Sequence, residues 1–156
     1  FDINKIPSLQ NKVKLILCKM YPLKVNMDVQ ELISVVNGNL ITEPNSQSLS
    51  KVIKGGCGAD LMSHVLAYAQ PEAVLITGLC NPQVVRTAQM ADVSAIVFVR
   101  GKKPLQETID LANEEFIPLI TTPLGVFEVC GRLHTAGLPS LETPVTITEK
   151  INPKSA

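Results

Sequence analysis

The chain has 156 residues, of which 46% are hydrophobic and 18% charged, a composition typical of a folded domain and not of a disordered chain. Its 14 basic and 14 acidic residues cancel, so it lacks the basic excess of proteins that bind nucleic acid by neutralising phosphates. The longest early apolar run, at 13–18, is far too short to cross a bilayer. We therefore expect a globular protein that binds neither nucleic acid nor membrane.

The first 25 residues do not fit the pattern that follows. Val13, Leu15 and Leu17 alternate with lysines, as in an edge strand with one apolar face. Residues 1–25 are therefore predicted to be an N-terminal extension or an edge strand. Because the net charge is zero and such a segment is more than a lone domain needs, we also expect a homodimer.

The clear signals begin after this extension. Asp28 and Glu31 have the spacing of a capping box, which predicts a short helix that ends at Asn37-Gly38. A strand is predicted at 40–42, and the polar stretch 43–50 is predicted to be a loop.

From residue 51 onward, short apolar strands alternate with longer amphipathic helices. The strands are predicted at 51–56, 73–77, 95–99 and 118–121, and the helices at 59–69, 82–91, 104–115 and 123–137. Such alternation is typical of right-handed βαβ crossovers. The sequence therefore predicts an α/β fold of three layers with a mainly parallel sheet, formed by residues 26–138. Residues 139–156 are predicted to be a C-terminal tail that lies on the surface or pairs with a neighbouring subunit.

The carboxyl ends of parallel strands meet at one edge of a sheet, where ligands bind in open α/β folds. Glycines, threonines and polar side chains gather in the predicted loops at that edge, and the following helix starts offer free N–H groups to an anion. The candidate ligand-binding residues are Gly55, Gly56, Asp60, Thr77, Asn81, Arg100, Thr121 and Thr122. Glycine and proline are also ordinary turn residues, so a simple set of turns, or a surface for a partner protein, remains an alternative.

Catalysis by a nucleophile requires a base beside it, and the only formal pairs join Cys57 or Cys80 to His64. Cys130 and His134 lie four residues apart on one predicted helix, which leaves a metal site as an alternative. Because no nucleophile, base and oxyanion set is assembled, we expect a protein that is not an enzyme and needs no cofactor or metal. A thiol or metal redox sensor, or an enzyme using Cys57 or Cys80, remains the competing hypothesis.

The four cysteines are widely spaced and include no Cys-x-x-Cys pair. The chain is larger than the small secreted scaffolds that depend on disulfides, and no signal peptide is recognisable. These features predict reduced cysteines and a cytoplasmic location.

Three stretches resemble the DRTGG domain family: MDVQELISVVNG, the GG-x-x-x-DLMSHVLA segment and IPLITTPLGVFEVCGRL. The resemblance covers about residues 26–138 and is closest to the small stand-alone members encoded beside iron-only hydrogenase genes. Related domains include the N-terminal domain of HPr kinase/phosphorylase. The family's eponymous string is absent, and the corresponding loop has the sequence TGLCNP.

This resemblance implies a small three-layer α/β domain, commonly dimeric, with a regulatory or ligand-sensing role. By analogy with relatives that sit beside nucleotide-sensing modules, an adenine nucleotide is the first expected ligand and a small anion the second. A hydrogenase-associated redox or signalling protein is the expected partner. The kinase activity of HPr kinase is not implied, because the domain that carries it has no counterpart here.

Overall fold

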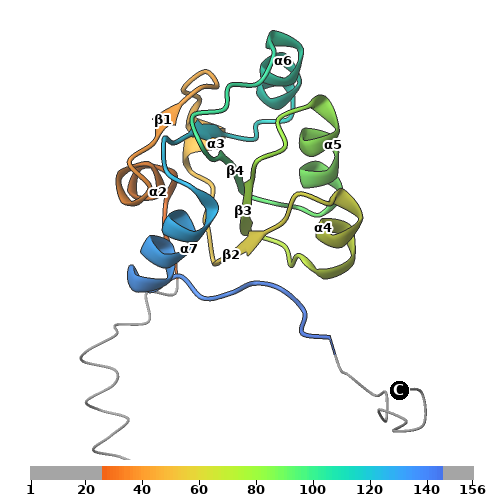
Figure 1. The fold of residues 1–156 in the computed structure, drawn as a ribbon. Helices are drawn as coiled ribbons and strands as arrows, with labels where there is room; N and C mark the ends of the chain where they lie inside the picture. The colour runs from red at the N-terminus through yellow and green to blue at the C-terminus, as the bar shows by residue number, and fades with distance from the viewer. Residues whose placement is uncertain (1–25, 146–156) are drawn as a thin grey trace, which may run out of the picture.

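The computed structural model describes residues 26–145 as a three-layer α/β domain with a five-stranded sheet at its centre (Figure 1). The strands lie in the order β1-β5-β4-β3-β2, and β2 to β5 are parallel. The strands are β1 (Asn39–Leu40), β2 (Gly55–Gly58), β3 (Ala73–Thr77), β4 (Ala95–Phe98) and β5 (Leu119–Thr121). The helices are α2 (Val29–Val35), α3 (Ser46–Leu49), α4 (Met62–Tyr68), α5 (Pro82–Met90), α6 (Gln106–Glu114) and α7 (Val126–Thr135). The predicted fold class is confirmed.

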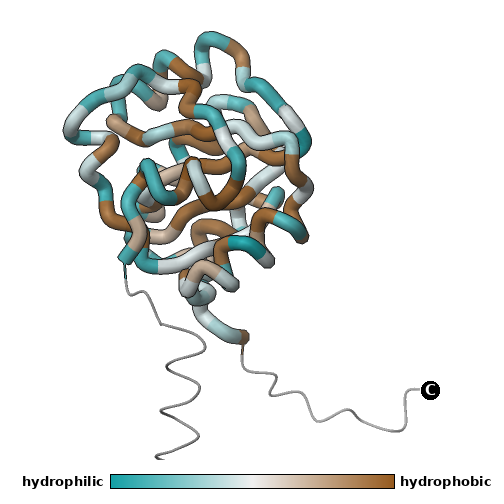
Figure 2. The backbone as a smooth tube through the Cα atoms, turned by 90° about the vertical axis from the view of Figure 1, so that its left-hand side faces the viewer, coloured by the Kyte–Doolittle hydropathy of each residue, from teal (hydrophilic) through white to brown (hydrophobic). Residues whose placement is uncertain are grey.

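Two hydrophobic layers hold the helices to the sheet. On one face, α2 and α7 pack on the sheet through a cluster that includes Leu32, Val97 and Val129. On the other face, α4, α5 and α6 cover a second cluster that includes Val65 and Val85. The sheet between them appears as the mainly brown, hydrophobic interior of Figure 2. The central strands β3 and β4 are buried at every position, as their unbroken apolar sequences predicted.

The first helix is capped as predicted. The side chain of Asp28 accepts a hydrogen bond from the backbone N–H of Glu31 at 2.8 Å, and Asn37, beyond the helix end, has a φ of 51°. Within residues 26–145, no helix is long and apolar enough to cross a membrane.

Three element predictions need correction. The first parallel strand lies at Gly55–Gly58 and not at 51–56, because Ile53 instead forms an antiparallel bridge with Met27. The predicted strand at 40–42 is limited to β1, which runs antiparallel to β5. The predicted loop contains α3, where the Asn45 side chain accepts from the N–H of Gln47 at 2.8 Å and so caps a short helix.

The segment 139–143, which we call the C-terminal edge segment, lies along the outer side of β2. The N–H of Gly56 donates to the carbonyl of Pro139 at 2.9 Å, and the N–H of Leu141 donates back to the carbonyl of Gly56 at 2.9 Å. The N–H of Thr143 donates to the carbonyl of Tyr68 at 2.8 Å, which ties the segment to the end of α4. These residues, predicted to belong to a tail, therefore pair with their own domain. The predictions for residues 1–25 and 146–156 lie outside the described residues.

Candidate functional site

An acidic side chain holds the carboxyl ends of β2 and β3 together. Oδ1 of Asp60 accepts from the hydroxyl of Thr77 at 2.9 Å and from the N–H of Gly78 at 2.7 Å. These two hydrogen bonds, first that of Gly78, together with the charges of Lys102 and Arg100, lower the pKa of Asp60 from its ordinary value. Asp60 is therefore a fixed negative charge at this edge of the sheet, although it lies at the surface.

Two cations from the loop after β4 reach the same place. The ammonium of Lys102 donates to the carbonyl of Gly78 at 2.6 Å. A Cβ placed on Gly78 would lie 3.6 Å from Oδ1 of Asp60 and 3.7 Å from Nη1 of Arg100, so the carboxylate and the guanidinium flank this glycine. We call Asp60, Thr77, Gly78, Arg100 and Lys102 the edge cluster.

The loop that carries these cations has an unusual backbone. Arg100 has a φ of 59° and Gly101 a φ of 64°, in the left-handed region that non-glycine residues enter at a cost of about 1–2 kcal/mol. The N–H of Arg100 donates to the carbonyl of Leu124, and that of Gly101 to the carbonyl of Thr122, each at 2.8 Å. These two hydrogen bonds fix the backbone of the turn, and the backbone sets the direction of the Arg100 side chain.

The structure brings some of the predicted site residues together and separates others. Asp60, Thr77 and Arg100 belong to the edge cluster, and Thr121 adjoins it because its hydroxyl donates to the carbonyl of Lys102 at 2.8 Å. Asn81 is exposed at the N-cap of α5, where its side chain makes no capping hydrogen bond.

Three of the predicted residues have other positions or roles. Gly55 and Gly56 lie in β2 opposite Ala73 and Val74, at the beginning of β3 and away from the carboxyl edge, so their predicted placement in an edge loop is wrong. Thr122 is buried, and its hydroxyl donates to the carbonyl of Val36 at 2.6 Å, which is a structural contact.

Two members of the edge cluster were not among the predicted site residues, although Lys102 was recognised as part of a basic cluster with Arg100 and Lys103. Gly78 follows Thr77 directly, and Lys102 follows Arg100 by two residues. The nearness of Lys102 to Arg100 in a loop after a buried strand was the signal available for it. The role of Gly78 depends on its backbone N–H and C=O, which no side-chain pattern reveals.

Asp60→Asn is expected to reduce the loss of stability in acid. A lowered pKa in the folded protein means that the carboxylate stabilises the fold above its unfolded pKa of about 3.9, and this contribution disappears as the pH falls through the lowered value. Asparagine keeps the acceptor oxygen for Gly78 but cannot titrate. The free energy of unfolding, measured at pH 7 and pH 3, should change less in the variant than in the natural protein; an equal change would contradict this.

Away from the edge cluster, a cavity of about 500 Å³ lies between β2, α7 and the C-terminal edge segment. We call it the α7 cavity. Inside it, the Cys57 thiol donates to Oε1 of Glu142 at 3.1 Å. Burial, and then the Glu142 carboxylate, raise the pKa of Cys57 to about 12, and burial also raises the pKa of Cys130.

Cys57 is poorly suited to be the nucleophile of the competing hypothesis, because the thiolate is the reactive form and a raised pKa lowers the fraction of thiolate. His64 is exposed on α4, where its ring centroid lies 5.8 Å from that of Tyr68. Cys80 is a half-buried free thiol in the loop before α5. Among residues 26–145, no group of three or more histidines, cysteines and carboxylates is placed to hold a metal ion.

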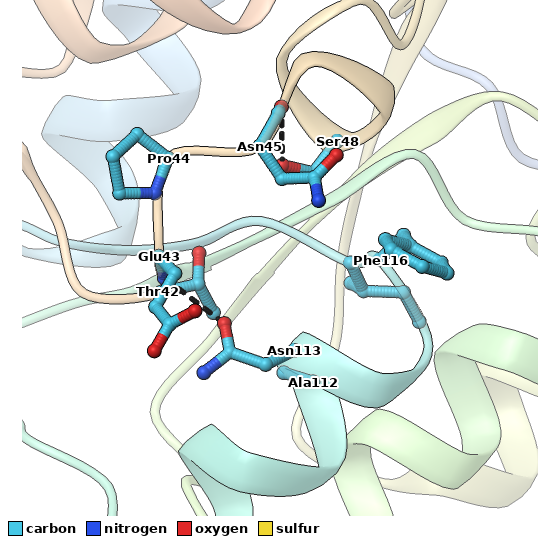
Figure 3. A pocket seen from close by; sticks show the side chains of 9 residues that line it. Thr42, Glu43, Pro44, Asn45, Ser48, Ala112, Asn113 and Phe116 are labelled. Carbon is cyan, nitrogen blue, oxygen red and sulfur yellow. Dashed lines mark hydrogen bonds between the residues drawn. The ribbon is translucent and has the colours of Figure 1, made fainter.

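A second and much smaller cavity, of about 70 Å³, lies between the α3 region and α6 (Figure 3). The amide oxygen of Asn113 accepts from the N–H of Glu43 at 2.9 Å, and the hydroxyl of Ser48 donates to the carbonyl of Asn45 at 3.0 Å. This volume suits a few water molecules and is well below the ~300 Å³ of small-ligand pockets.

The fold and these sites define a small α/β domain with a polar cluster at the carboxyl edge of its sheet. The model of the DRTGG domain family matches residues 31–136, and the chain therefore belongs to this family. No curated protein matches it in sequence.

A solved structure has the same fold. It contains the CBS and DRTGG domains of the regulatory region of Clostridium perfringens pyrophosphatase, in complex with the activator diadenosine tetraphosphate. The TM-score is 0.62 at 19% sequence identity over 85% of this chain. The match spans 60% of the length of the clostridial chain.

Proposed function

We propose that this chain is a regulatory domain without catalytic activity, and that it senses a small anionic ligand at the edge cluster, with an adenine nucleotide as the first candidate. The observation that carries the proposal is the pair of cations, Arg100 and Lys102, held beside Gly78 at the carboxyl edge of a parallel sheet. Membership of the DRTGG family supports the regulatory part. The nucleotide part draws on the clostridial regulatory region, which was solved with a nucleotide activator.

The chemistry of the edge cluster fits a phosphate or carboxylate. A guanidinium can bind either group through two parallel hydrogen bonds, and an ammonium adds a second charge. With two cations and the single carboxylate of Asp60, the cluster keeps one net positive charge. Helix α5 begins directly after the loop that follows Gly78. The free N–H groups at the start of a helix favour the binding of an anion.

The wider roles proposed for the protein draw on the resemblance and on the charge and cysteine content described above. We propose that the chain forms a homodimer in the cytoplasm and acts in hydrogenase or redox metabolism through a hydrogenase-associated partner. A partner protein at the same edge is the second candidate for the edge cluster, since the side chain of Leu105, just beyond its loop, is 74% exposed.

A thermal-shift series tests the ligand. ATP, ADP, AMP, diadenosine tetraphosphate and inorganic phosphate should be compared on the natural chain, and a ligand present at 100 times its Kd should stabilise the fold by about 2.7 kcal/mol. Arg100→Ala and Asn81→Ala are expected to lose most of that shift. Lys103→Ala is the matched control, because it removes one cation from the same loop without touching the contact of Lys102 with Gly78.

An equal loss of the shift in Lys103→Ala would mean that only the overall charge matters, and would contradict a defined site. No shift with any of these ligands would remove the small-molecule part of the proposal. Capture of a protein partner that is lost in Leu105→Asp would then favour the second candidate.

A further inference from the structure

The α7 cavity has no part in the proposed function and shares no residue with the edge cluster. Its volume of about 500 Å³ lies within the range of small-molecule pockets, ~300–1,000 Å³. Apolar side chains such as Ile76 and Leu133 line it together with a few polar groups, among them Cys57 and Glu142. An apolar cavity with a few converging polar groups is the usual form of a ligand site.

Three glycines, Gly56, Gly58 and Gly131, line this cavity, and nothing within the domain requires them. The nearest atom to an added Cβ would be 3.6 Å away at Gly56 and 3.7 Å away at Gly58, which are ordinary contacts, and nothing lies within 4 Å at Gly131. The only glycines with positive φ among residues 26–145 are Gly101 and Gly137, so none of the three serves a left-handed backbone.

Glycine in the interior of a strand or helix weakens it, because the unfolded chain has more conformational freedom to lose. Gly56 and Gly58 belong to β2, and Gly131 lies in the middle of α7. All three glycines line the same cavity, so the backbone of β2 and α7 is uncovered there. In strands, glycine often marks the place where a ligand approaches the backbone closely.

Phe127 borders the same cavity with its side chain 92% exposed, the highest exposure among the large hydrophobic residues of 26–145. It lies one helical turn before Gly131, so an aromatic ring stands beside an uncovered stretch of helix. A ring placed there suits a flat partner, which it would contact by stacking.

The polar end of the cavity offers a hydrogen-bond acceptor, the exposed carboxylate of Glu142. Oε1 of Glu142 already accepts from the Cys57 thiol, whereas Oε2 has no hydrogen-bond partner among the described residues. The thiol hydrogen bond fixes the carboxylate, because a protonated sulfur can only donate to it. The free oxygen can accept an N–H group from a bound molecule.

We propose that the α7 cavity binds a planar, uncharged nitrogen heterocycle of the nucleobase type, with its ring on the surface left open by the glycines and an amino N–H donating to Glu142. The ring would lie against Phe127 on one side. The uncharged form is favoured because the cavity is lined mainly by apolar groups and because the Glu142 carboxylate would repel an anion.

The test uses adenine and hypoxanthine as probes, since hypoxanthine replaces the amino group of adenine with a carbonyl. Amide chemical shifts of the full chain should move at Gly58 and Gly131 when adenine is added, and hypoxanthine should bind at least tenfold more weakly. Glu142→Gln places an amide N–H2 where the free oxygen was, so this preference should shrink or reverse. Gly131→Leu fills the cavity and should weaken adenine binding by at least tenfold.

Ala67→Leu is the control for Gly131→Leu, because it adds the same side chain to an exposed position of another helix, α4. It should leave adenine binding unchanged, and so should Arg100→Ala, which keeps this test separate from that of the proposed function. The proposal is overturned if neither probe moves these amides, or if Gly131→Leu binds adenine normally. It is also overturned if Gly131→Leu instead converts a dimer into a monomer in sedimentation, since α7 would then be covered by a second copy of the chain.

Discussion

Phe98→Ala is expected to lower the free energy of unfolding by about 3–5 kcal/mol. Phe98 ends the central strand β4 with its side chain fully buried, and it is the largest of the fully buried side chains in residues 26–145. Because domains of this size are stable by only about 5–15 kcal/mol, the variant would lose a large part of its stability. Urea unfolding should be followed by circular dichroism, since the chain has no tryptophan.

Phe127→Ala provides the matched comparison. It removes the same atoms from a side chain that is 92% exposed, so its effect on stability should stay within about 0.5 kcal/mol. If the two substitutions cost the same, the burial of Phe98 would not be what stabilises the central strand.

Gly55→Ala is expected to cost about 1–3 kcal/mol through overpacking. The added Cβ would lie 2.5 Å from Cβ of Leu141 and 2.8 Å from the carbonyl oxygen of Pro139, so the C-terminal edge segment must move away from β2. Amide hydrogen exchange should therefore speed up at Leu141, whose N–H donates to Gly56.

Gly56→Ala is the control for Gly55→Ala, at the next position of the same strand. Its Cβ would meet Ile76 at 3.6 Å, an ordinary contact, and alanine costs less backbone entropy than glycine. This variant should be as stable as the natural chain or slightly more stable. Equal destabilisation by both substitutions would show that the close contact of Gly55 with the C-terminal edge segment is not the cause.

The parts of the fold that were predictable are those in which a few neighbouring residues decide the outcome. The apolar runs of β3 and β4 predicted strands buried on both faces, and the Asp28 cap predicted the start of α2. Each of these signals is local, so the sequence pattern contains it in full.

The parts that were missed depend on residues far apart in the chain. On its outer side, β2 pairs with a segment more than 80 residues later in the chain, and Cys57 meets Glu142 across 85 positions. The α7 cavity is built from the same pairing, so no local pattern could indicate it. At the edge cluster, the predicted strand order was enough to indicate several of the residues. The contact of Lys102 with the Gly78 carbonyl depends on the three-dimensional shape of the loop, which the sequence pattern does not contain.

The C-terminal edge segment also protects the molecule against aggregation. A glycine-rich edge strand such as β2 offers unpaired N–H and C=O groups and specifies its register weakly, which invites pairing with another chain. Here Pro139 and Leu141 occupy the backbone groups of Gly56 that would otherwise be open. The family match ends at residue 136, before the C-terminal edge segment begins. A fragment cut at that boundary would therefore expose an unpaired edge of the sheet, prone to aggregation, which the longer chain covers.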